Sequence, residues 1–185
     1  MRVSSSRIAA VFTALLVFVL LAFAARSAFA DDLADEAELQ FQLGADRYKA
    51  NDFRGALEHF LASNRLVPNR NVVFNIAHTY EQLREMPNAY RYYTIARDQE
   101  PNPVTRKKIE DAIAHIAPQV AVLKIETQPP GATIYIDRKD LGARGETPRS
   151  LGLAAGSYKV IAAKDGYEEA SAGPFKVKVG TETPV

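Results

Sequence analysis

The chain has 185 residues, of which 47% are hydrophobic and 24% charged, values that are ordinary for a globular protein. It contains no cysteine, which excludes disulfide bonds, cysteine metal sites and lipid attachment to a cysteine. The formal net charge of +1 is too small to favour nucleic-acid binding.

Residues 1–30 have the pattern of a signal peptide. Two arginines precede an almost wholly apolar stretch over residues 8–25, and small residues occupy both key positions of a cleavage site at 28–30. We expect cleavage after Ala30 and export to the periplasm or cell envelope of a Gram-negative-type bacterium. The alternative is a retained membrane anchor, because 18 residues over 8–25 approach the length that spans a bilayer.

Residues 31–117 are predicted to form helices, because apolar residues recur at spacings of three and four, as at Leu57, Phe60 and Leu61. The pattern also repeats after 33 residues. Six small or apolar landmarks coincide at this offset: Phe41 with Phe74, Leu43 with Ile76, Gly44 with Ala77, Ala56 with Ala89, Phe60 with Tyr93, and Pro68 with Pro101. Each block therefore predicts a helix–turn–helix unit that stacks on its neighbour.

Residues 104–117 add one more amphipathic helix. Ile109, Ile113 and Ile116 lie on one face of it, and the charged residues lie elsewhere. We expect this helix to cap the array, because terminal units of a repeat protein close its core.

The repeat landmarks resemble those of the tetratricopeptide repeat (TPR) family, which places small residues where its helices cross and an aromatic residue beside them. The matching positions are Gly44, Ala56, Phe60 and Pro68 in the first repeat and Ala77, Tyr80, Ala89, Tyr93, Ala96 and Pro101 in the second. The chain departs from the family at Arg47, where a tyrosine is usual and Tyr48 comes one place later, and at Ser63, which replaces an alanine. The resemblance implies an α-α helical repeat array over residues 37–103.

After Pro118 the hydrophobic pattern changes to a period of two. The alternation predicts strands that begin at Val120 and that cover residues 133–137, 158–163 and 175–179. Turns are predicted at glycines that recur every three to ten residues, namely Gly142, Gly145, Gly152, Gly156, Gly166, Gly173 and Gly180. Residues 118–185 are therefore predicted to form a small antiparallel β-sandwich.

Specific positions in this half resemble the PEGA domain. They are Pro130-Gly131-Ala132, Ile134-Tyr135-Ile136-Asp137, Gly142, Thr147-Pro148, Leu151, Gly156-Ser157-Tyr158 and Gly166-Tyr167. Pro130 stands where the family has a glutamate. The resemblance implies a β-sandwich of surface or envelope proteins, often beside helical repeats and without catalytic residues.

The C-terminal end of the PEGA-like region is shorter than the family pattern. Family members continue into a further strand after the segment that matches residues 176–185. We therefore expect the natural chain to extend beyond Val185. The alternative is a sandwich with an open edge, which is hazardous because an unpaired strand invites aggregation.

Candidate catalytic and metal-binding residues do not converge in the sequence. The three histidines, His59, His78 and His115, fall on three different predicted helices. Glu168 and Glu169 are adjacent, and adjacent side chains on a strand would point to opposite faces, so the pair is interpreted as a solvated turn edge. We therefore expect no enzyme activity, no catalytic or metal site and no cofactor.

The TPR resemblance points to a concave groove lined by the first helix of each unit. The candidate partner-binding residues are Phe41, Ala45 and Tyr48 in the first repeat, Phe74, Asn75, His78 and Glu81 in the second, and Lys107 and Asp111 on the capping helix. Aromatic residues on a face that meets water are typical of a peptide-binding surface. The alternative is that they pack against residues 33–39 or against another chain.

Together these features predict a non-enzymatic envelope protein that mediates protein–protein interaction or scaffolding through the TPR-like groove. The PEGA-like domain would serve as a spacer or surface-contact module. The alternative function is binding of cell-wall polysaccharide or peptidoglycan by the β-domain, through Tyr135 with Tyr158 or Tyr167, because sugar rings stack on aromatic faces. The expected partner is a protein or peptide of the envelope, with no nucleic acid, and with membrane contact only if the signal segment is uncleaved.

Overall fold

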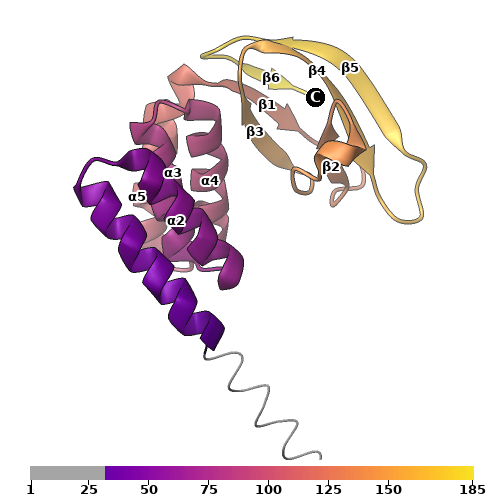
Figure 1. Ribbon diagram of the computed structural model, residues 1–185. Helices are drawn as coiled ribbons and strands as arrows, with labels where there is room; N and C mark the ends of the chain where they lie inside the picture. The colour runs from indigo at the N-terminus through magenta and orange to yellow at the C-terminus, as the bar shows by residue number, and fades with distance from the viewer. Residues whose placement is uncertain (1–31) are drawn as a thin grey trace, which may run out of the picture.

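The computed structural model describes residues 32–185, which form helices followed by a β-sandwich (Figure 1). The predicted cleavage site and the alternative membrane anchor lie outside the described residues. The predicted helical-then-β layout is confirmed. Among residues 32–185, no helix has the length and apolar character needed to cross a bilayer.

The helical part contains a helix over residues 32–49, called here the N-terminal helix, and four more. These are α2 (Phe53–Leu66), α3 (Arg70–Gln82), α4 (Met86–Gln99) and α5 (Pro103–Ile116). Three of the four begin at a side-chain cap: Asp52, Asn69 and Asn102 each accept a hydrogen bond from a backbone N–H of the first turn.

The predicted 33-residue repeat is visible in the helix bounds. The helices α2 and α4 begin 33 positions apart, at Phe53 and Met86, and so do α3 and α5, at Arg70 and Pro103. Small residues allow the helices to pack closely. A Cβ atom added to Gly44 of the N-terminal helix would lie 2.7 Å from Cδ1 of the buried Phe60 ring on α2.

The β part is a sandwich of two three-stranded sheets. One has the order β3 (Arg149–Leu153), β1 (Ala121–Ile125), β6 (Glu182–Pro184), and the other the order β2 (Thr133–Ile136), β4 (Gly156–Ala163), β5 (Ala170–Val177). Their facing sides bury a sandwich core of Ala121, Leu123, Ile125, Ile134, Ile136, Leu151, Leu153, Val160 and Val177.

Two strands and one pairing direction differ from the sequence prediction. The alternation did not reveal β3, and Gly152, expected in a turn, lies inside it. The short strand β6 pairs with β1 in parallel, so the first sheet is mixed, whereas a purely antiparallel sandwich was predicted. Backbone bonds from Val185 to Lys124 and from Glu126 to Val185, at 2.8 and 2.9 Å, hold this segment along β1.

The helical and β parts share a buried contact, called here the junction. Val122 on β1 and Val120, just before this strand, belong to the same buried cluster as Tyr90 of α4 and Ile116 of α5. Tyr90 is 7% exposed, and its ring lies over Gly152, where a Cβ atom would come within 2.6 Å of the ring. The boundary predicted between the two domains, 31–117 and 118–185, falls near the change from helix to strand. The buried cluster of the junction contains residues from both sides of this boundary.

Candidate functional site

The structure brings part of the predicted groove together. Tyr48 of the N-terminal helix and His78 of α3 form a hydrogen bond of 3.2 Å between the phenol oxygen and Nδ1. The Phe74 ring lies 6.2 Å from the His78 ring, centroid to centroid. Glu81 accepts a hydrogen bond of 2.6 Å from the Tyr93 hydroxyl of α4.

The remaining groove candidates are less closely joined. Phe41 packs on Phe60, with ring centroids 5.7 Å apart. The Asn75 amide donates to the backbone oxygen of Asn71. On α5, Lys107 and Asp111 are exposed and form an ion pair with each other at 2.6 Å.

The aromatic candidates contact the second helix of each unit. Phe41 lies against the buried Phe60 of α2, and the Phe74 ring lies 5.6 Å from the buried Tyr93 of α4. Phe41, Tyr48 and Phe74 are each half-buried. These contacts give the rings a packing role between helices, and their role in partner binding stays a prediction.

Alkaline pH is expected to destabilise this helical packing. Burial and the neighbouring Glu81 carboxylate raise the pKa of Tyr93 far above its usual value, and burial also raises the pKa of Tyr48 and Tyr90. From about pH 10 upward the unfolded chain therefore loses protons that the folded chain retains, and the free energy of unfolding falls. Guanidinium denaturation at increasing pH, with tyrosinate absorbance, measures the decline.

The control for this titration is Tyr93→Phe, which removes the group with the largest upward shift. The variant is expected to show a shallower decline of unfolding free energy with pH. Tyrosinate formation by every tyrosine near its ordinary pKa, with the helical circular dichroism unchanged, would contradict the assignment.

The three tyrosines considered for sugar binding do not form one face. Ile134 and Ile136 point into the sandwich, so Tyr135 between them points outward, where the Lys139 ammonium lies 5.4 Å from its ring centroid. Tyr158 packs against the sandwich core instead. Tyr167 is 61% exposed in the segment between β4 and β5. The geometry therefore supplies no shared stacking platform for Tyr135 and Tyr158.

The described histidines likewise do not meet. His59 bonds to Gln40 at 2.7 Å, His78 bonds to Tyr48, and His115 lies exposed on α5. Within residues 32–185, no group of three or more His, Asp or Glu side chains could hold a metal ion.

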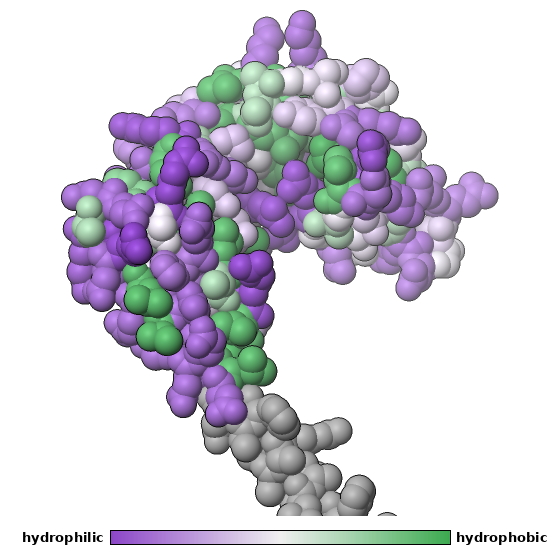
Figure 2. Space-filling view, in the orientation of Figure 1, coloured by the Kyte–Doolittle hydropathy of each residue, from purple (hydrophilic) through white to green (hydrophobic). Residues whose placement is uncertain are grey.

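A cavity of about 390 Å³ lies between α4 and the sandwich, at a place that the sequence did not indicate. It is called here the cleft. Its walls are α4, the strand β3, the end of β2 and the loop between these strands. Figure 2 shows a hollow between the helical part and the sandwich, whose walls carry both hydrophilic and hydrophobic residues.

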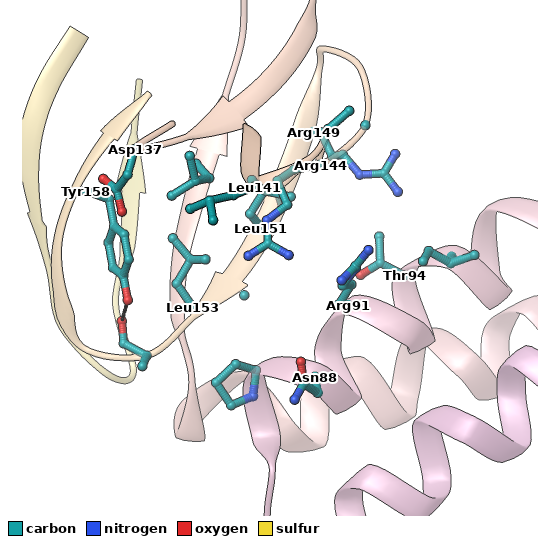
Figure 3. Close-up of a pocket in the computed structure, with 18 residues that line it drawn as sticks. Asn88, Arg91, Thr94, Asp137, Leu141, Arg144, Arg149, Leu151, Leu153 and Tyr158 are labelled. Carbon is teal, nitrogen blue, oxygen red and sulfur yellow. Dashed lines mark hydrogen bonds between the residues drawn. The ribbon is translucent and has the colours of Figure 1, made fainter. Parts of the chain in front are cut away.

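Apolar side chains form the sandwich side of the cleft. Leu151, Leu153 and Ile136 reach it from the sandwich core, and Leu141, which is 64% exposed, covers it from the loop. In Figure 3, Leu141, Leu151 and Leu153 lie opposite Arg91 and Thr94 of α4. An apolar side chain of a ligand could therefore lose contact with water here.

Three arginines give the cleft a positive charge. Arg149 faces Asp98 at 3.5 Å. Arg91, on α4, and Arg144, in the loop before β3, form no ion pair with any residue in the described part of the chain. The one carboxylate in the lining, Asp137, accepts a hydrogen bond of 2.8 Å from the Lys159 backbone N–H. The cleft can therefore accept an anionic group beside an apolar one.

Sequence reasoning missed the cleft because its walls are far apart in the chain. One wall comes from residues 87–95 and the others from residues 136–158. The two arginines in the short stretch 144–149 were a local signal, but only the junction shows what they face.

Comparison with known proteins bears on the β part. No curated protein matches this chain. Residues 120–183 match the family model of the PEGA domain, which confirms that part of the sequence-based resemblance. The protein thus contains a PEGA domain over residues 120–183, preceded by a region of helices whose bounds repeat after 33 residues.

Proposed function

We propose that this protein is a non-enzymatic interaction module that binds an acidic, partly apolar segment of a protein partner in the cleft. The observation that carries the proposal is the pair of arginines, Arg91 and Arg144, that line a partly apolar cavity without a counter-ion among the described residues. Guanidinium groups bind carboxylates through two parallel hydrogen bonds, so they select this kind of ligand by geometry as well as by charge.

The size and lining of the cleft agree with ligand binding. Its volume of about 390 Å³ falls within the range of about 300–1,000 Å³ that is usual for ligand sites. The lining includes one carboxylate and no histidine, which favours binding over acid–base catalysis. A PEGA domain fits this role as a surface-contact module.

The proposal includes the finer expectations from the sequence. The helical part is a TPR-like array with a capping helix, which the 33-residue spacing of the helix bounds supports. Export to the envelope rests on the signal-peptide pattern of residues 1–30. The shared buried junction supports a scaffolding role, because it holds the helical array and the PEGA domain against each other.

Replacing both unpaired arginines, as Arg91→Glu with Arg144→Glu, is expected to abolish binding of acidic peptides. A displayed library of random heptapeptides, selected on the purified protein, should enrich peptides that combine Asp or Glu with aliphatic residues. The selected peptides should bind the double variant at least about 100-fold more weakly, because two charge-assisted contacts become two repulsions. Titration calorimetry of individual peptides measures the loss.

Arg54→Glu is the matched control, since Arg54 is an exposed arginine on α2, away from the cleft, with no ion pair in the described residues. It makes the same change of charge per site and should leave binding unchanged. Equal binding to the double variant and to the native protein, or a library that enriches no acidic peptide, would count against the proposal.

A further inference from the structure

We infer that the partner segment binds as an extended strand added to the free edge of β3, with acidic and apolar residues in alternation. The inference rests on the proposed function and specifies how the cleft is filled. It begins from the place of β3 in its sheet, where β3 pairs with β1 on one side only.

The cleft runs along the free edge of this strand. Its lining includes six consecutive residues, Arg149 to Ala154. Successive side chains of a strand point to opposite faces, so a cavity beside only one face would meet every second residue. Contact with all six places the cavity along the edge of the strand, beside its backbone.

The hydrogen bonds of β1 identify which backbone groups of β3 point into the cleft. The N–H of Val122 and the C=O of Lys124, both on β1, form hydrogen bonds with the segment that contains β6. Because backbone groups of successive strand residues point to opposite sides, the N–H and C=O of Leu123 point to β3. Its partner in the register is Leu151. The N–H and C=O groups of Ser150 and Gly152 therefore point to the free edge, and they bond to no other backbone group in the described residues.

These free groups are what an added strand requires. Two N–H donors and two C=O acceptors, at alternate residues, match the hydrogen-bonding pattern of an extended peptide. Exposed strand edges of this kind are normally covered or protected in folded proteins. Here α4 and the β2–β3 loop flank this edge and leave a cavity of about 390 Å³ beside it.

The two walls define the side chains that the segment must carry. Leu151 and Leu153 face the sandwich core, and Gly152 faces Tyr90 of α4, so the sides of β3 differ in chemistry. Residues of an added strand that point to the sandwich would meet leucines, and those that point to α4 would meet Arg91. The inferred ligand is a segment of about five residues, the length of β3, with aliphatic and acidic residues alternating.

The test uses the blocked synthetic peptide Val-Glu-Val-Glu-Val and measures amide hydrogen exchange of the full protein by NMR. The amides of Ser150 and Gly152 are expected to become protected at least about tenfold at saturation, because each gains a hydrogen-bond partner. The amides of Leu151 and Leu153 point to β1 and serve as internal controls whose protection changes little.

Two further peptides, one with N-methyl groups on the glutamates and one with N-methyl groups on the valines, lack N–H donors but keep the same charge. One of the two methylated forms is expected to bind at least about tenfold more weakly, since it loses donors that face β3. If the unmodified peptide binds through Arg91 and Arg144 but neither form is weakened and Ser150 stays unprotected, strand addition is wrong and the proposed function stands. If no acidic peptide binds at all, both fail.

Discussion

Gly152→Val is expected to destabilise the protein and to weaken the packing of the PEGA domain on α4. A Cβ atom at this position would lie 2.6 Å from Cδ1 and Cγ of the Tyr90 ring, which is buried in the junction. Inside a strand, valine normally has a higher propensity than glycine, so propensity alone predicts a gain in stability. The overpacking should outweigh it and lower the free energy of unfolding by about 1–3 kcal/mol. Guanidinium denaturation of the purified protein measures the change.

The companion variant Tyr90→Ala separates the collision from other effects of the valine. Alone, it removes a large buried ring and should cost about 3–5 kcal/mol. Combined with Gly152→Val it should cost less than the two single effects added together, because the valine side chain then occupies part of the vacated space. Additive losses, or a Gly152→Val protein as stable as the native one, would show that the glycine is not required by Tyr90.

The helices were predictable from sequence because their signals are local. Apolar spacing of three and four residues places each helix, and Pro68 and Pro101 follow the ends of α2 and α4 as the pattern indicates. The 33-residue offset that aligns Phe60 with Tyr93 also aligns the starts of the helices that carry them. Apart from the repeat offset, each of these features depends on residues within a few helical turns of one another.

The missed strands depend on distant partners. In β3 the sequence Arg149-Ser150-Leu151-Gly152 contains a glycine and two polar residues, and it becomes a strand because it pairs with β1. In β6 three residues that include Pro184 carry no alternation, and the strand exists through its parallel pairing with residues 122–124. Local propensity does not determine such pairings, which the tertiary fold supplies.

The surroundings of the predicted groove residues and the existence of the cleft were not predictable from sequence for the same reason. Phe41, Tyr48 and Phe74 were assigned to a groove by their positions in the repeat, without knowledge that rings on α2 and α4 fill the space beside them. Arg91 and Arg144 are 53 positions apart, and only the contact between Tyr90 and Gly152 brings their walls to one cavity. Sequence periodicity does not reveal a contact between two different kinds of structure.

Phe60→Ala is expected to cause one of the largest losses of stability in the helical part. The Phe60 side chain is 2% exposed and fills the space between the N-terminal helix and α3. On the N-terminal helix, its ring packs against Phe41 and lies beside Gly44. On α3, Ile76 belongs to the same buried cluster. Truncation leaves a cavity that the helices cannot close fully, so the unfolding free energy should fall by about 3–5 kcal/mol. Phe41→Ala, at a half-buried position, should cost clearly less.

Gly44→Ala tests the same contact from the other helix. Alanine favours a helix over glycine by about 1 kcal/mol, so an isolated helix would gain stability from this change. In the protein the added Cβ would lie 2.7 Å from the Phe60 ring, and the collision should reverse the sign. At the equivalent place of the second repeat the chain carries Ala77 in the same buried cluster as Tyr93, so a Cβ atom is accommodated there. In a protein that also carries Phe60→Leu, Gly44→Ala should therefore be less destabilising than it is in the native background. A stabilising effect of Gly44→Ala alone would mean that Phe60 does not set the distance between the two helices.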